Sequence, residues 1–279
     1  MHRLLCLALL VAAPSTLASP PPLDFDTARG AREVGMGGTF REMGIGANAA
    51  DGNPAQLSLV QAYQLEFAGG WDAKSKGWYL AGWARDSTNP DISGAYSIHY
   101  LNNDIGGGQR LAQWDHSLSL ATRLGDIVAI GIGGRWFIQG TPRSINAASM
   151  NAGIAIRAAK TLTLGFAAYN LIDTHHPEMS RAFEFGFSWL IGPLRLASEV
   201  RSDLGRGPVQ PIVNAGLEFF IGRAFVLRGG WEWQDPTRTN YGSLGLGFVV
   251  DNAGFDVGYR HGLSGAGDLV VGTFRLQLQ

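Results

Sequence analysis

Two groups of side chains in this sequence could support metal or acid–base chemistry. In the first group, His175 and His176 are adjacent and Glu178 follows two positions later. Adjacent histidines in an extended chain point in different directions, and no third ligand follows at a useful spacing. The first group therefore predicts no metal site.

The second group consists of acidic and histidine residues near the ends of expected strands: Asp72, Asp235, His261 and Asp268. Nothing in their spacing fixes a common geometry, and polar groups at the rim of a β-structure are normally solvated. The sequence also has no Ser-His-Asp spacing, nucleotide-binding loop or cofactor motif. We therefore predict no catalytic residue, no metal and no cofactor, and we expect that the protein is not an enzyme.

Composition narrows the class of protein further. The 279-residue chain has a formal net charge of −1, which gives no reason to expect a nucleic-acid partner. Glycine is abundant, at 39 residues. The one cysteine, Cys6, lies in a segment that we expect to be removed, so the mature chain would carry no disulfide.

The first residues have the pattern of an export signal. Arg3 supplies a positive start, an apolar run follows from Leu4 to Ala13, and Thr16-Leu17-Ala18 offers a small-residue cleavage site. The apolar run is too short to span a bilayer. We expect residues 1–18 to be a signal peptide that directs the chain out of the cytoplasm.

From about Tyr63 onward the sequence alternates between apolar and small or polar residues. Such period-two runs predict β-strands with one apolar face. We count about fourteen: 62–71, 77–85, 92–101, 112–124, 127–137, 148–158, 162–171, 181–191, 194–202, 210–221, 225–234, 241–250, 254–261 and 269–278. Most have about the 9–11 residues that cross a bilayer as a tilted strand. Residues 62–279 therefore predict an all-β, transmembrane, antiparallel up-and-down β-barrel in a bacterial outer membrane, in contact with its lipid.

The connections and the tryptophans support the barrel. Short connections alternate with longer polar ones, such as 102–111 and 172–180, which predicts periplasmic turns at one end, together with both termini, and surface loops at the other. We expect the tryptophans near strand ends to face the lipid–water boundary as two girdles: Trp71, Trp78, Trp114, Trp136, Trp231 and Trp233 at the outer boundary, and Trp83 and Trp189 at the inner one.

Charged residues occupy the other face of the later strands. Folding the chain at Gly192-Pro193 places Glu184 opposite Arg201, and folding it at 222–224 places Glu218 opposite Arg228. Opposite charges on neighbouring strands can neutralise each other inside the lumen. We predict a charge ladder that stiffens the wall; a track for a substrate is the alternative.

Residues 19–61, before the first strand, have a different pattern. Asn53 and Pro54 suit the cap and first position of a short helix from Asn53 to about Val60. Several glycines permit close approach of the backbone to other elements. The segment resembles the N-terminal signature of the FadL/PorV superfamily of outer-membrane proteins, a GAR-x-x-GMGG-(A/T)-F phrase followed by N-P-A. The positions that we single out are Gly30, Arg32, Gly35, Gly37, Gly38, Phe40, Asn53 and Pro54.

This resemblance implies a hatch inside the barrel and two kinds of function. A PorV-like member would be a scaffold or partner subunit of a cell-surface machine for protein secretion or gliding, with protein partners in the envelope. A FadL-like member would transport a hydrophobic small molecule across the outer membrane. The short polar connections and charged lumen favour the PorV-like role. The sequence names neither a ligand-binding residue nor a cargo.

Overall fold

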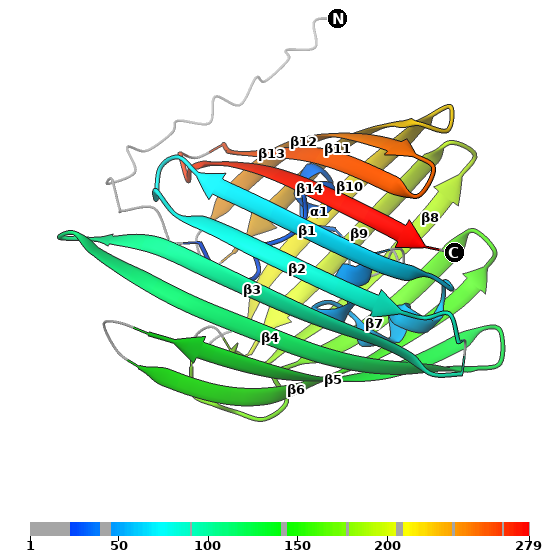
Figure 1. The fold of residues 1–279 in the computed structure, drawn as a ribbon, viewed down its shortest axis with the longest axis horizontal. Helices are drawn as coiled ribbons and strands as arrows, with labels where there is room; N and C mark the ends of the chain where they lie inside the picture. Colours follow the sequence, from blue (N-terminus) through cyan, green and yellow to red (C-terminus); the bar gives the residue numbers. More distant parts are fainter. Residues whose placement is uncertain are drawn as a thin grey trace, which may run out of the picture.

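The computed structural model describes residues 23–39, 46–89, 91–140, 144–176, 179–204, 209–235, 238–263 and 265–278. Within them the chain forms a closed barrel in which each strand pairs antiparallel with the next and β14 closes on β1 (Figure 1). The fourteen strands are β1 (Tyr63–Asp72), β2 (Trp78–Asp86), β3 (Ser93–Gly106), β4 (Gln109–Leu124), β5 (Val128–Gln139), β6 (Ile145–Ala159), β7 (Leu162–Tyr169), β8 (Ala182–Ile191), β9 (Leu194–Asp203), β10 (Gln210–Ile221), β11 (Phe225–Gln234), β12 (Thr239–Val250), β13 (Ala253–Gly262) and β14 (Asp268–Leu278). The predicted barrel and strand count are confirmed.

The period-two pattern determines which residues face outward. On β14, Phe274 is exposed on the outer surface, whereas its neighbour Thr273 is buried in the lumen. On β10, Leu217 is exposed and Glu218 is buried in the same way. Successive residues of a strand point to opposite faces. A shift of a strand by one residue would therefore exchange its outward-facing and lumen-facing residues. The apolar outer surface is the face that a lipid bilayer requires.

The connections alternate broadly as predicted, but one predicted loop is wrong. Residues 102–111 mostly continue the strands, because β3 reaches Gly106 and β4 starts at Gln109. This hairpin extends beyond its neighbours and ends in glycines with positive φ, Gly106 to Gly108 (Figure 1). A hairpin that leaves the bilayer is wetted on both faces, so its sequence loses the apolar alternation by which we recognised strands.

One tryptophan was assigned to the wrong face. Trp71, Trp114, Trp136, Trp189 and Trp231 are exposed on the outer surface, as a lipid-facing girdle requires. Trp83, in contrast, is only 3% exposed and points into the lumen. Trp78 and Trp83 lie five positions apart on β2, so they must face opposite sides of the sheet. The odd spacing of the two residues on the strand would have placed Trp83 in the lumen, whereas its position near a strand end does not decide its face.

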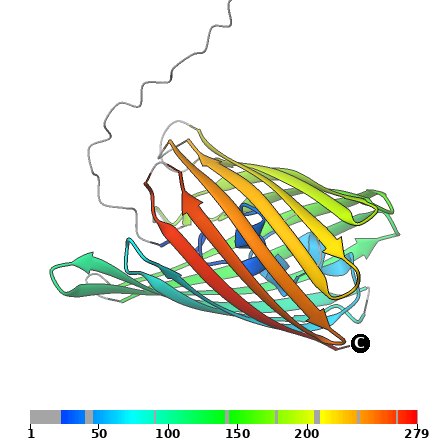
Figure 2. The ribbon, with the colours of Figure 1, turned by 90° about the horizontal axis from the view of Figure 1, so that it is seen from above.

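The N-terminal segment lies inside the barrel (Figures 1 and 2). We call its described residues, 23–39 and 46–60, the hatch. It contains helix α1 (Ala31–Gly35) and the 3₁₀ helices η1 (Ala47–Ala50) and η2 (Pro54–Ser58). Among the described residues, no helix is long and apolar enough to cross a membrane.

The hatch runs through the lumen from one end to the other. Leu23 exchanges two hydrogen bonds with Asn103, near the tip of the β3–β4 hairpin at the long-loop end, with distances of 3.1 and 2.8 Å. The hatch then leads into β1, which begins at the opposite, short-turn end beside Leu278, the last residue of β14. We expected both termini at the short-turn end; Leu23, the first described residue, lies instead at the long-loop end, and the residues before it lie outside the described part of the chain. The hatch has no strand periodicity, so its sequence does not show from which end of the lumen to which it runs.

Candidate functional site

Helix α1 packs against the inner face of β11–β14 at positions that lack side chains. Gly35 lies so close to Gly245 of β12 that a Cβ added to Gly35 would be 2.8 Å from the Gly245 Cα. Gly37 has a φ of +66°, and its added Cβ would be 2.7 Å from the Trp231 carbonyl oxygen. Glycine is required at residue 37 for both conformation and space. The glycines of the signature therefore let the hatch backbone touch the wall.

An ion cluster attaches the hatch to the wall. Arg32 donates from Nε and Nη2 to the two carboxylate oxygens of Glu218, at 2.9 and 2.8 Å. Glu218 also accepts from Arg228 at 2.9 Å and from Arg195 at 2.8 Å. A buried carboxylate with this many charge-assisted bonds is held in one geometry. The cluster therefore holds α1 in one position against the wall.

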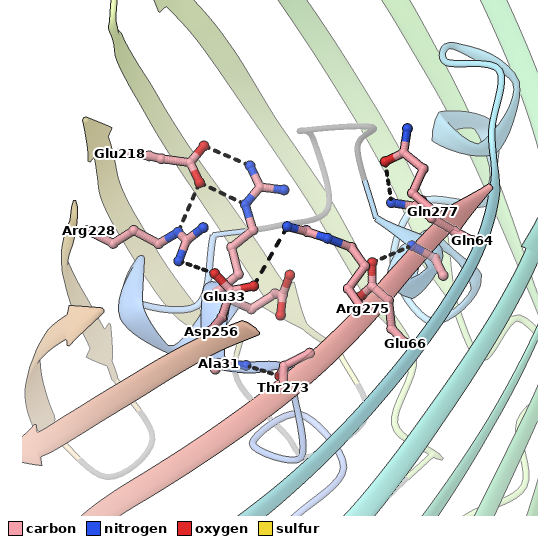
Figure 3. A network of polar contacts seen from close by, with 12 residues as sticks. Ala31, Glu33, Gln64, Glu66, Glu218, Arg228, Asp256, Thr273, Arg275 and Gln277 are labelled. Carbon is pink, nitrogen blue, oxygen red and sulfur yellow. Dashed lines mark hydrogen bonds and ion pairs between the residues drawn. The ribbon is translucent and has the colours of Figure 1, made fainter. Parts of the chain in front are cut away.

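Two further strands extend this cluster around the wall (Figure 3). Arg228 donates to Asp256 of β13 at 2.6 Å, and Asp256 in turn lies 3.8 Å from Arg275 of β14. Beside them, the Thr273 hydroxyl accepts from the Ala31 amide at 2.7 Å. The hatch is thus bound through polar groups to β9, β10 and β14.

The residues of the predicted charge ladder lie opposite each other on neighbouring strands, and two of them also form ion pairs with the hatch. Glu218 lies opposite Arg228, and Glu184 lies opposite Arg201, as expected. Arg201 forms an ion pair with Asp26 of the hatch, just as Glu218 does with Arg32. These charges therefore join the hatch to the barrel besides joining strand to strand. That they stiffen the wall stays a prediction, with a track for a substrate as its alternative.

The second anchor of the hatch is η2, against β4–β6 near the short-turn end. The Asn53 side chain accepts from the Ala55 amide at 3.1 Å, which is the expected N-cap, and donates to the Ile154 carbonyl of β6 at 3.0 Å. Pro54 occupies the first helical turn, as predicted. Gly131 provides space, since an added Cβ would be 2.6 Å from the Pro54 carbonyl carbon. Phe40 of the signature lies outside the described residues.

A second polar centre lies between η1 and β2–β3. Asp51, directly after η1, accepts from His99 Nε2 at 2.8 Å and also from the Trp83 indole and the Ser97 hydroxyl. Burial raises the pKa of Asp51, but His99 and these hydrogen bonds lower it more, so that the pKa lies below its ordinary value. Asp51 is therefore ionised at neutral pH, and it fixes the orientation of the His99 ring.

Next to this centre, the long-loop half of the lumen contains a cavity that is open to solvent. Its walls include the aromatic rings of Phe25, Trp83 and Tyr169. Its polar lining includes His99 and the ion pair between Asp115 and Arg135, which are joined at 2.8 Å. The cavity is thus partly aromatic and partly polar, and the hatch forms one of its sides.

Sequence reasoning missed most of the residues that line this cavity. His99, Asp115 and Arg135 drew no attention because each is a single polar residue within a strand. Their inward direction follows from alternation with outward neighbours such as Tyr100 and Trp114. Alternation could therefore have placed each of them in the lumen, but not shown that they share one cavity with Asp51.

The residues that first suggested chemistry stay apart from this cavity. His261 and Asp268 form an exposed pair at 2.5 Å at the long-loop rim. The Asp72 side chain accepts from the Lys74 and Ser75 amides, and the Asp235 backbone carbonyl accepts from the Arg238 amide. His175 is exposed, and the His176 ring contacts the Phe137 ring at a tilt of 38°. Glu178 lies outside the described residues. Within the described chain, no cluster of three or more His, Cys, Asp or Glu residues could hold a metal.

The sequence matches no family model and no curated protein. Solved structures give a clear result. The toluene transporter TbuX of Ralstonia pickettii aligns over 90% of this chain and 99% of its own, with a TM-score of 0.71 and 12% identity. The chain has the fold of this transporter. The monoaromatic hydrocarbon channel CymD aligns over 91% and 98% with a TM-score of 0.71 and 11% identity, and a FadL homologue of Pseudomonas aeruginosa over 93% and 99% with a TM-score of 0.59 and 12% identity.

These neighbours are channels and transporters. The FadL-like part of the resemblance agrees with this likeness in fold, whereas nothing in it is specific to PorV-like proteins.

Proposed function

We propose that the protein transports small hydrophobic molecules across the bacterial outer membrane. This reverses the order suggested by the sequence, in which a scaffold role in a secretion or gliding machine came first. The observation that carries the proposal is a hatch bound inside the lumen beside an open cavity, in a fold shared over nine-tenths of the chain with a toluene transporter. A scaffold needs a stable outer surface but has no need of such a cavity.

The sequence argument against transport also becomes weaker. It rested on short polar loops, and especially on residues 102–111, most of which belong to strands β3 and β4. It rested also on charge in the lumen. Part of that charge binds the hatch, as in the ion pairs of Glu218 with Arg32 and of Arg201 with Asp26. The charged lumen is therefore compatible with a gated route for neutral solutes.

The test compares uptake of radiolabelled toluene by intact bacteria that do or do not produce the protein. Transport predicts faster uptake in producing cells at low solute concentration, with no change in uptake of a polar solute such as sucrose. Equal acceleration of both solutes would indicate a nonspecific pore. No acceleration, together with a stable protein partner that co-purifies with the barrel, would favour the scaffold function.

A further inference from the structure

The His99 ring at the wall of the cavity has one nitrogen engaged and one without a partner. Nε2 is bonded to Asp51, whereas the buried Nδ1 has no hydrogen-bond partner among the described residues. A buried polar atom without a partner destabilises the structure unless water or a ligand satisfies it. His99 itself is only 4% exposed and belongs to the cavity lining. Its Nδ1 therefore marks a place where a ligand can gain a hydrogen bond.

Aromatic rings surround the same histidine. The Trp83 ring meets His99 edge to face, with centroids 5.1 Å apart and an interplanar angle of 88°. The Phe25 ring lies 6.2 Å from His99 on the hatch side and also touches Phe137 at 5.8 Å. Rings in such arrangements favour a further aromatic ring in edge or offset contact.

We propose that this cavity binds a small neutral aromatic molecule that carries a hydroxyl group. Its ring would lie beside Phe25 and Trp83, and its hydroxyl would pair with His99 Nδ1. The inference rests on the proposed function, because it names the chemical class of the solute for the same lumen.

The lining argues for a neutral solute with a hydroxyl group. Carboxylates and guanidinium groups both line the cavity, and they pair with one another, as Asp115 does with Arg135 and Asp26 with Arg201. A charged solute would meet like charges and compete with these pairs. A plain hydrocarbon would leave Nδ1 without a bond. A hydroxyl group both donates and accepts, so it satisfies Nδ1 whether the imidazole is neutral or protonated.

The test uses ¹⁹F NMR on the purified full-length protein in detergent micelles, with 4-fluorophenol as the probe and fluorobenzene as its matched control. The two probes differ only by the hydroxyl group. We expect saturable binding of 4-fluorophenol at least tenfold tighter than binding of fluorobenzene. The same titration in empty micelles measures partitioning of each probe into the detergent. Equal or tighter binding of fluorobenzene, or no saturable binding of either probe, would overturn the proposal.

Two variants identify the site. In His99→Gln, the amide nitrogen can still donate to Asp51, but no group remains at the position of Nδ1. We expect this variant to keep the fold and to lose the preference for 4-fluorophenol. His116→Phe, at a histidine on the outer surface next to Trp114, should keep the preference. A preference that persists in His99→Gln would refute the assignment. If the protein binds 4-fluorophenol but does not accelerate toluene uptake, the transport function is refuted, whereas the binding site is supported.

Discussion

Arg32 and Glu218 are 186 positions apart in the chain and form a buried, doubly hydrogen-bonded ion pair, with N–O distances of 2.9 and 2.8 Å. The pair joins a helix inside the lumen to a strand of the wall. Since Glu218 also bonds Arg195 and Arg228, the wall carboxylate stays compensated when the hatch moves. The pair is therefore suited to hold the hatch without making the barrel depend on it.

The first prediction concerns this ion pair. Arg32→Met should weaken docking of the hatch by about 1.5–3 kcal/mol, the usual range for hydrogen bonds to a charged group. The barrel should still fold, because Glu218 keeps two arginine partners. Hydrogen exchange of residues 31–35 should become faster. The control is Arg223→Met in the exposed turn after β10. Unchanged protection of α1 in Arg32→Met would show that packing alone holds the hatch.

The second prediction concerns the close packing of α1. Gly37→Val should displace the hatch from β11, because the added side chain meets the Trp231 backbone and residue 37 has a positive φ. Protease cleavage within the hatch should increase, while the shift of the barrel on a gel between heated and unheated samples should remain. Gly272→Ala is the control, since no atom lies within 4 Å of its added Cβ. A hatch equally protected in both variants would contradict the docking geometry.

The third prediction concerns pH. Burial and the neighbouring Glu66 raise the pKa of Glu33 on the hatch above its ordinary value of 4.5. A carboxyl with a raised pKa binds more protons in the docked state than in the released state, so docking is favoured at low pH. Docking should weaken as the pH rises from 4.5 through the raised pKa.

Protease accessibility of the hatch measured against pH tests this prediction. Wild-type protein should become more accessible across that interval, and Glu33→Gln should remove most of the change. The control, Asp126→Asn in the exposed turn before β5, should follow the wild type. An identical pH profile in Glu33→Gln would show that another group is responsible.

The fourth prediction concerns the lipid face. Phe274 lies in the middle of β14, exposed on the outer surface, whereas Leu278 lies at the short-turn end of the same strand. Phe274→Arg should destabilise the barrel by about 2–4 kcal/mol, and Leu278→Arg by about 0–1 kcal/mol, because the cost of a charge falls toward the interface. Urea unfolding in lipid vesicles measures both values. Equal costs would show that β14 does not cross the bilayer at this depth.

The barrel could be predicted from the sequence because its signal is local and repeated. Phe185 and Glu184 face opposite sides of the sheet because adjacent residues of a strand always do. The same alternation recurs along fourteen strands. The site depends instead on contacts between distant residues. Nothing in the sequence near Arg32 identifies Glu218, and nothing near Asp51 identifies His99 as its partner. The signature motif predicted that a hatch exists, but its direction and its bonds follow only from the three-dimensional arrangement.

The last prediction concerns movement of the hatch during transport. α1 contacts β11–β14, whereas η2 contacts β4–β6 on another part of the wall, so the hatch spans the lumen between the cavity and the short-turn end. A solute that enters the cavity must therefore displace part of the hatch to reach that end. A covalent bond between hatch and wall should therefore stop transport.

Gly30→Cys with Thr273→Cys provides this bond. A Cβ added at residue 30 would be 3.4 Å from the Thr273 hydroxyl oxygen, which a cysteine sulfur would replace. The two cysteine side chains would therefore be adjacent, as the short S–S bond of a disulfide requires. Cys6 is replaced by Ser so that no other thiol competes. Oxidised cells should lose protein-dependent toluene uptake and recover it after a reductant is added, whereas each single-cysteine variant should transport under both conditions. If the oxidised variant transports toluene as fast as the reduced one, the solute leaves the cavity by a route that bypasses α1, and the hatch is a fixed part of the wall.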